Sequence, residues 1–321
     1  MRVRRALLGA CCALAACAAV AQVSVQEYPL PPGLGAHDVW ADPAPGGPVW
    51  FSAQASGQLG RLDPASGKVE LIGLGRGSAP HGVILGPDGG VWLTDSGQNA
   101  IVRVDPQSKS VKAFPLPAAA DYANLNTAVF DRTGTLWFTG QSGVYGRLDP
   151  KDGALKVFDA PRGVGPYGIQ ATSDGAVYYV SLAGSYLGRI DPASGGASIL
   201  EPPTARQGAR RVWPDSQGKL WIAEWNAGQL ARYDPAGGRW TEWKAPGKAP
   251  RVYAVYVDER DRVWASEWSS QTMLSFDPAS GKFEIHRSTS RQPNVRQIHG
   301  RKGEVWTPES GADKIVVYRF R

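Results

Sequence analysis

Cysteine and long apolar stretches are absent from this 321-residue sequence beyond its first 21 residues. The three cysteines are Cys11, Cys12 and Cys17, so the rest of the chain offers no residue for a disulfide. No apolar segment after residue 21 approaches the length of a transmembrane helix. Basic residues form no run that would indicate a nucleic-acid-binding surface, although the formal net charge is +6. These absences argue against a disulfide scaffold, a helical membrane domain and a nucleic-acid partner.

The first 21 residues resemble an export signal. Residues 1–5 are basic, and residues 6–16 form an apolar stretch too short to span a bilayer comfortably. Residues 19–21 (Ala-Val-Ala) fit a signal-peptidase site with Gln22 as the new N-terminus. Residues 14–17 (Leu-Ala-Ala-Cys) alternatively resemble a bacterial lipobox, which would leave an outer-membrane lipoprotein anchored through Cys17. We therefore expect a signal peptide over 1–21 and a mature chain that is periplasmic or secreted.

Glycine and proline are plentiful, with 39 and 25 residues, which suits a fold with many turns. Residues 80–117 form a unit of four short strands, expected at 83–85, 91–94, 101–104 and 111–116, separated by Gly, Asp and Pro signals. An aromatic residue opens the second strand of each unit, at steps of 41 to 45 residues: Trp50, Trp92, Trp137, Tyr178, Trp221, Trp264 and Trp306. An Asp-Pro pair that ends the third strand keeps the same period, with its aspartate at Asp63, Asp105, Asp149, Asp191, Asp234 and Asp277. This period, with four strands per unit, predicts an all-β, seven-bladed β-propeller.

The chain ends indicate how the ring closes. The last unit supplies a third strand at 315–320 but no fourth, whereas the segment 25–30 resembles the fourth strands of other units. We expect this N-terminal strand to complete the last blade, which leaves few unpaired edges. Residues 22–321 would then be one domain, which we expect to be a monomer. The repeated aromatics are expected to pack between blades, and the repeated aspartates to accept bonds from turn amides.

Two positions vary between blades yet stay mostly polar, as expected of a lined pocket on one face near the axis. The first lies at the start of each first strand: His37, His81, Asn126, Tyr167, Arg210, Tyr253 and either Val295 or Arg296. The second lies three residues after each aromatic: Ala53, Asp95, Gly140, Ser181, Glu224, Glu267 and Glu309. The alternative is that these are solvated loop residues whose charges pair locally, such as Arg210 with Glu224.

His37 and His81 are the sharpest candidates, because they are two of only four histidines and share one position on neighbouring blades. Imidazole can act as a general base near neutral pH or bind a metal, and we expect Asp95 beside His81 and His81 itself to face solvent. Glu224, Glu267 and Glu309 stand on three neighbouring blades. The repulsion between their charges would favour a bound cation or nearby arginines. The sequence therefore predicts His81 and His37 as catalytic and Asp95, Glu267 and Glu309 as metal ligands. The predicted ligand-binding residues are Asn126, Tyr167, Arg210, Glu224, Trp225, Tyr253, Trp268 and Arg296. A competing interpretation is that Pro-His-Gly at 80–82 is simply a common propeller turn.

The motifs of residues 80–117 resemble the virginiamycin B lyase (streptogramin lyase) propellers: Pro-His-Gly-Val, Gly-Pro-Asp-Gly-x-Val-Trp, Asn-x-Ile-x-Arg-x-Asp-Pro and Val-x-x-Phe-x-Leu-Pro. The resemblance implies a seven-bladed propeller and a Mg²⁺-assisted elimination that opens the ester of a cyclic depsipeptide without adding water. In that family, histidines at the strand starts of two neighbouring late blades act as the base, and acidic residues hold the metal. The corresponding positions here are Tyr253 and Val295 or Arg296, so neither is histidine. A similar grouping of His37, His81 and Asp95 lies on the first two blades instead.

Three functions stay open from the sequence. The first is a metal-assisted carbon–oxygen lyase acting on a cyclic ester, with His81 as base and Mg²⁺ as cofactor. The second is a non-catalytic envelope module that binds a small molecule, peptide or glycan on a platform of Trp225, Tyr253 and Trp268. The third is a lactonase-type hydrolase with a cation on the axis. Because fold does not determine function, the choice depends on which of these side chains converge.

Overall fold

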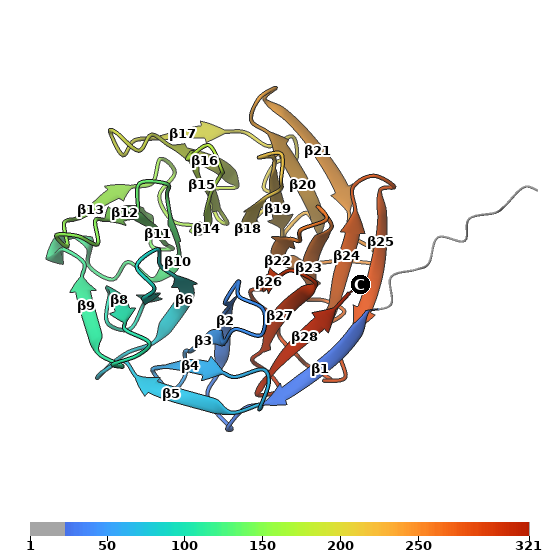
Figure 1. Ribbon diagram of the computed structural model, residues 1–321. Helices are drawn as coiled ribbons and strands as arrows, with labels where there is room; N and C mark the ends of the chain where they lie inside the picture. The colour runs from blue at the N-terminus through green and yellow to red at the C-terminus, as the bar shows by residue number, and fades with distance from the viewer. Residues whose placement is uncertain (1–22, 321) are drawn as a thin grey trace, which may run out of the picture.

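The computed structural model describes residues 23–320, which form seven four-stranded antiparallel sheets arranged as blades around a central axis (Figure 1). The predicted all-β, seven-bladed propeller is confirmed. The predicted signal peptide and the lipobox at Cys17 lie outside the described residues. Within the described part of the chain, no helix is long and apolar enough to cross a membrane, and the helical element present is a 3₁₀ turn, η1 (Ala118–Ala120).

Each blade runs from an inner strand at the axis to an outer strand at the rim (Figure 1). Blade one has β2 (Ala36–Ala41), β3 (Val49–Ala53), β4 (Gln58–Leu62) and β5 (Val69–Gly73). Blade two has β6 (Pro80–Leu85), β7 (Val91–Asp95), β8 (Ala100–Val104) and β9 (Val111–Pro115). Blade three has β10 (Leu125–Phe130), β11 (Leu136–Gly140), β12 (Val144–Leu148) and β13 (Leu155–Asp159). Blade four has β14 (Pro166–Ala171), β15 (Val177–Ser181), β16 (Tyr186–Ile190) and β17 (Ala197–Leu200).

The remaining blades follow the same plan. Blade five has β18 (Ala209–Pro214), β19 (Leu220–Glu224), β20 (Gln229–Asp234) and β21 (Arg239–Lys244). Blade six has β22 (Val252–Val257), β23 (Val263–Glu267), β24 (Thr272–Asp277) and β25 (Lys282–Arg287). Blade seven has β26 (His299–Arg301), β27 (Glu304–Glu309), β28 (Lys314–Arg319) and the N-terminal strand β1 (Ser24–Pro29).

The ring closes as predicted, because β1 pairs with β28 in one continuous antiparallel register (Figure 1). Val25 faces Tyr318 and Tyr28 faces Ile315 in that register. The Tyr28 ring stacks on Trp306 at a centroid distance of 5.6 Å. Backbone pairing and aromatic packing therefore both join the two ends of the chain, which removes two unpaired edges at once.

The repeated aromatics pack between neighbouring blades, as expected, and each is at most 2% exposed. Acidic residues between the first and second strands of most blades have a structural role that the sequence did not indicate. The indole N–H groups of Trp92, Trp137, Trp221 and Trp264 donate to Asp88, Asp131, Asp215 and Asp258, and Trp306 donates to Glu304, over 2.8 to 3.1 Å. The repeated third-strand aspartates accept from the amide two residues later, as predicted. The buried indole groups of these five blades are thus satisfied within their own blade, whereas that of Trp50 has no partner among the described residues.

In each of the first three blades, the side-chain hydroxyl two residues after the repeated aromatic bonds to the backbone of the next blade. The Thr94 hydroxyl accepts from the amide of Gly82 at 2.8 Å and donates to the carbonyl of Asn126 on the next blade at 2.5 Å. Ser52 donates in the same way to the carbonyl of His81, and Thr139 to that of Tyr167. A Cβ atom on Gly82 would lie 2.7 Å from the Asn126 carbonyl, so only glycine permits this approach. These bonds hold the backbone of the axial residues in place.

Candidate functional site

The predicted strand-start residues converge on the axis and form what we call the first ring: His37, His81, Asn126, Tyr167, Arg210, Tyr253 and Arg296. Contacts across the ring show the convergence. The hydroxyls of Tyr167 and Tyr253 lie 2.6 Å apart, and the rings of His37 and His81 have centroids 4.0 Å apart. Of the two candidates in blade seven, Arg296 belongs to the ring, because its guanidinium carbon lies 5.0 Å from the ring centre of Trp268, which packs against Tyr253. Val295 instead lines a pocket between blades six and seven.

The next residue along each strand forms a second ring that the sequence reasoning missed. Five of its members, Thr127, Gly168, Arg211, Ala254 and Gln297, line a narrow cavity on the axis. Asp38 lies within this region, since it accepts a bond from Arg211 at 3.1 Å. The signal was present in the sequence: Asp38 directly follows His37, and Arg211 directly follows Arg210.

His37 is oriented by a chain of two contacts. Its Nδ1 atom lies 2.7 Å from Oδ1 of Asp38, and the same oxygen accepts from the Arg211 guanidinium. A proton on that oxygen would point at a cation, so Oδ1 is the acceptor and the hydrogen is on His37 Nδ1. His37 Nε2 makes no hydrogen bond with any described residue. Its lone pair is therefore the free basic site.

His81 is held in the same tautomer, with its hydrogen on Nδ1, by a longer chain of contacts. Arg211 donates to the Thr127 hydroxyl at 2.6 Å, which must then donate its own hydrogen to Asn126 Oδ1 at 2.7 Å. The amide nitrogen of Asn126 consequently faces His81 Nε2, at 3.2 Å. Nε2 is thus an acceptor and the hydrogen is on Nδ1, which is buried without a partner. His81 therefore presents a donor on a ring whose centroid lies 4.0 Å from that of His37.

Both imidazoles are neutral near pH 7. Burial lowers the pKa of His37 well below 6.5, and the charges of Arg211, Arg296 and Arg210 lower it further. Burial also lowers the pKa of His81 well below 6.5, as does His37 beside it. Burial raises the pKa of Asp38, an effect opposed by Arg211. The expectation that His81 faces solvent is wrong: the residue is 5% exposed, because the ring side chains close over one another at the axis.

Asp95 does not lie beside the imidazole of His81. Its Cα partner across the hairpin is Pro80, and its carboxylate accepts from Ser78, Ala79, Gly97 and Gln98. Glu267 binds its own loop in the same manner, accepting from the amides of Arg251, Ser269 and Ser270 and from the Ser270 hydroxyl. Both carboxylates thus accept hydrogen bonds from nearby backbone amides and serine hydroxyls, so their oxygens are already bonded.

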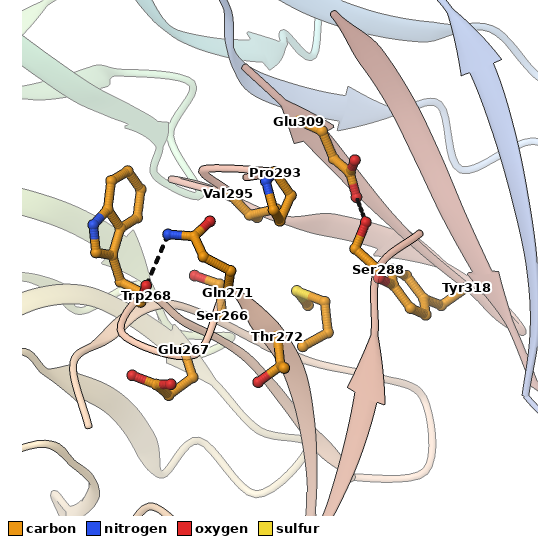
Figure 2. A pocket seen from close by; sticks show the side chains of 11 residues that line it. Ser266, Glu267, Trp268, Gln271, Thr272, Ser288, Pro293, Val295, Glu309 and Tyr318 are labelled. Carbon is orange, nitrogen blue, oxygen red and sulfur yellow. Dashed lines mark hydrogen bonds between the residues drawn. The ribbon is translucent and has the colours of Figure 1, made fainter. Parts of the chain in front are cut away.

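Glu224 and Glu309 are also buried in their own blades. Glu224 accepts from Gln229 at 2.6 Å, and burial raises its pKa to about 8. It forms no ion pair with Arg210, so the local pairing considered from the sequence is not found. Glu309 accepts from the Ser288 hydroxyl at 2.7 Å, and Figure 2 shows it on a different wall of the blade-six/blade-seven pocket from Glu267. The three glutamates therefore do not converge on one point.

The predicted ligand-binding aromatics do converge with the first ring. Trp225, Tyr253 and Trp268 have ring centroids 5.4 to 6.0 Å from one another. The Arg210 guanidinium carbon lies 4.2 Å from the ring centres of Trp225 and Tyr253, and that of Arg296 lies 5.0 Å from Trp268. Since Trp225 and Trp268 are half-buried, this aromatic corner borders solvent. It provides flat apolar surface next to two cations.

The sequence profile of the virginiamycin B lyase family matches residues 15–237. The chain belongs to this family. Virginiamycin B lyase from Staphylococcus aureus superposes with a TM-score of 0.86 at 21% identity, over 93% of this chain and 99% of that one. A catalytically inactive histidine-to-alanine variant of that lyase, crystallised with quinupristin, gives 0.85 at 21% identity, over 93% and 99%. The extracellular domain of a protein described as a one-component system from B. thetaiotaomicron gives 0.70 at 16% identity, over 92% of this chain and 39% of that one. Among curated proteins, none matches.

Magnesium, which the virginiamycin B lyase family implies, does not fit the residues on the axis. Among the described residues, the group whose ligand atoms all lie within 4.8 Å of one another is His37, Asp38 and His81. Mg²⁺ prefers oxygen ligands, whereas this group offers two imidazoles and one carboxylate that already holds Arg211. Three guanidinium groups nearby would also repel a cation. Asp95, Glu267 and Glu309 lie at the ends of three different strands, are bonded to other groups, and do not supply the missing oxygens.

Proposed function

We propose that this member of the virginiamycin B lyase family is a carbon–oxygen lyase that opens an ester by elimination, with His37 as its general base. The arrangement that carries the proposal is the series Arg211–Asp38–His37, which leaves the His37 Nε2 lone pair free on a buried, neutral imidazole. A carboxylate that fixes the tautomer and orientation of a basic histidine is a recurring device in enzymes. The role of base thus passes from His81, the first choice from sequence, to His37.

The proposed reaction uses only proton and electron-pair shifts. His37 Nε2 takes a proton from the carbon next to a carbonyl group, and the C–H electrons form a carbon–carbon double bond. The C–O bond on the neighbouring carbon breaks, and the ester oxygen leaves as a carboxylate. His81 Nδ1–H, which has no protein partner, is suited to donate to the carbonyl oxygen as negative charge develops there. No water is consumed.

The other two functions are less well supported. A lactonase-type site needs carboxylates around an axial cation, whereas Asp38, bonded to Arg211, is the one carboxylate that the described residues 23–320 bring to the histidines. A non-catalytic binding module is favoured by one observation, the corner of Trp225, Tyr253 and Trp268. That corner would also serve a lyase, so only an activity measurement separates the two.

The test is incubation with virginiamycin B, followed by mass spectrometry. Elimination opens the ring and leaves the mass unchanged, whereas hydrolysis adds one water. We expect a ring-opened product of unchanged mass, lost in His37→Ala and retained in Asp95→Asn. An added water would indicate a hydrolase. Intact virginiamycin B that nevertheless binds would indicate the binding module.

We also propose that the chain is exported. The basic and apolar composition of residues 1–21 supports this, and extracellular domains share the fold. Mass spectrometry of the protein recovered from the cell envelope tests the proposal. An N-terminus at Gln22 indicates a soluble form, and a lipid on Cys17 indicates an anchored one. Retention of residues 1–5 would contradict export.

A further inference from the structure

Arg210 and Arg296 carry charges that the protein does not neutralise. Neither guanidinium forms an ion pair with a carboxylate of the described residues. Arg210 donates to the Tyr167 hydroxyl at 3.0 Å, and its Nε is buried without a partner. Arg296 donates to the Ser310 hydroxyl and to the carbonyl of Asn294, both uncharged. Both arginines are half-buried, and a partly desolvated cation without a counter-charge is costly, so arginines in such places usually serve an anion.

The carboxyl groups near Arg210 and Arg296 already have other hydrogen-bond partners. Asp38 holds Arg211 and His37. Glu267 has its four bonds within its own loop. Glu224 is buried against Gln229 and keeps its proton at neutral pH. The axis therefore presents three guanidinium groups against one carboxylate, an excess of positive charge that favours an anionic ligand.

The aromatic rings determine how an anion can approach. Trp225 and Tyr253 lie against Arg210, and Trp268 lies against Arg296. Stacking of a planar guanidinium leaves its edge N–H groups as the donors that can receive an anion in a forked geometry. The same rings offer apolar surface to a flat group attached to that anion. A carboxylate joined to an aromatic or cyclic group matches both features.

We propose that Arg210 and Arg296 form a carboxylate-binding subsite that receives the carboxylate released from the ester. The assignment of this carboxylate as the leaving group rests on the proposed function. In the elimination, the C–O bond breaks with its electron pair remaining on the ester oxygen, so negative charge grows on the leaving carboxylate. A guanidinium beside that oxygen stabilises the transition state, which is work that a metal would otherwise perform. The subsite should therefore also bind free carboxylates.

Binding of benzoate, with benzamide as the uncharged probe of the same shape, tests the subsite independently of turnover. Calorimetric titration of the mature protein should show benzoate binding at least about tenfold tighter than benzamide, because only benzoate can pair with the arginines. Arg210→Gln and Arg296→Gln should each weaken benzoate binding about tenfold and leave benzamide binding unchanged. The matched control is Arg61→Gln. Arg61 lies on blade one, with its guanidinium carbon 5.8 Å from the ring centre of Trp50, and its replacement should change the binding of neither benzoate nor benzamide. Arg210→Lys keeps the positive charge and checks that a loss of benzoate binding in Arg210→Gln does not come from misfolding.

The outcomes separate this inference from the proposed function. Equal affinity for benzoate and benzamide, or unchanged benzoate binding in both glutamine variants, would overturn the subsite even if the protein is a lyase. Selective benzoate binding in wild type and His37→Ala, lost in the arginine variants, supports it. If benzoate binds selectively but virginiamycin B and other cyclic esters are not opened, the proposed reaction fails and the leaving-group assignment fails with it. The carboxylate-binding site would remain.

Discussion

Arg211 of blade five and Asp38 of blade one, 173 positions apart in the sequence, meet across the axis with Nη2 and Oδ1 3.1 Å apart. Both side chains are almost completely buried. The pair joins two blades that share no sheet, and it fixes both histidines: His37 through Asp38, and His81 through Thr127 and Asn126. A change at Arg211 should therefore affect both the stability of the ring and the chemistry at its centre.

We predict that Arg211→Met lowers the free energy of unfolding by about 3–5 kcal/mol, because it leaves Asp38 buried without its charged partner. Adding Asp38→Asn should recover part of this loss, since the uncompensated charge is then gone. Urea denaturation of wild type, Arg211→Met and the double variant provides the measurement. The control is Lys109→Met, which breaks the exposed pair with Glu70 and should cost less than about 1 kcal/mol. Equal losses at Arg211 and Lys109 would contradict the role of the axial pair.

Glu224 should make the protein less stable as the pH rises. Burial raises its pKa from 4.5 to about 8. Below pH 4.5 the carboxyl is protonated in both states, and its favourable contribution is fully present. Above this pH the unfolded chain loses the proton while the folded chain keeps it, so stability falls as the pH rises towards 8. Glu224→Gln should remove this dependence and be more stable at pH 8, by roughly 2–5 kcal/mol. A Glu224→Gln curve that declines with pH as steeply as wild type would refute the assignment.

The sequence predicted the fold almost completely because the repeat is local. Each turn glycine and third-strand aspartate acts within its own blade, and each aromatic recurs at the same position of its unit, so a period and a strand count suffice to place them. The first ring was found for the same reason, since five of its members stand eleven residues before the aromatic of their unit. Asp95 was misplaced because its carboxylate is bound by four donors, two in the loop that follows it and two in the segment before β6.

The pairs across the axis could not be predicted from periodicity. Arg211 reaches Asp38 and Thr127 because of the rotation between blades five, one and three, which no repeat length encodes. The tautomers of His37 and His81 depend on those pairs. The ring position in blade seven stayed open between Val295 and Arg296 because the first strand there is reduced to His299–Arg301. A shortened strand removes the register that the other blades provide.

The hydroxyl of Thr94 should matter more than its size suggests. It satisfies the Gly82 amide and the Asn126 carbonyl, and both lie at the axis. Thr94→Val keeps the shape of the side chain but leaves both groups unpaired, so we expect a loss of about 2–4 kcal/mol in urea denaturation. Ser266→Ala is the control, because Ser266 accepts from Ala254 alone and should cost about 1 kcal/mol. An unchanged Thr94→Val midpoint would show that water replaces both bonds.

Closure of the ring by β1 should dominate the thermal stability. Deleting residues 22–31 removes the whole β1–β28 pairing and the Tyr28 ring that stacks on Trp306. We expect a marked drop in Tm and exposure of the β28 edge, which invites association between molecules. Tyr28→Ala, which keeps the strand, should cost about 3–5 kcal/mol through the lost packing alone. An unchanged melting curve of the truncated protein would contradict the closure.

The acid limb of the lyase reaction should lie well below pH 6.5. A base must be unprotonated to act, and burial together with Arg211, Arg296 and Arg210 lowers the pKa of His37 well below 6.5. The value of kcat/KM should therefore stay level as the pH falls past 6.5 and decline only in more acidic solution, where the imidazole gains a proton. Removing one of the neighbouring arginine charges should make protonation of His37 easier. Arg296→Gln should therefore move the acid limb to a higher pH, whereas Arg61→Gln should not. Asp38→Asn should instead lower kcat by about 10²–10⁴ across the whole range, because the asparagine amide can donate to His37 Nδ1 and move the hydrogen to the basic nitrogen. A limb at or above pH 6.5 in wild type, unmoved in Arg296→Gln, would mean that His37 is not the base.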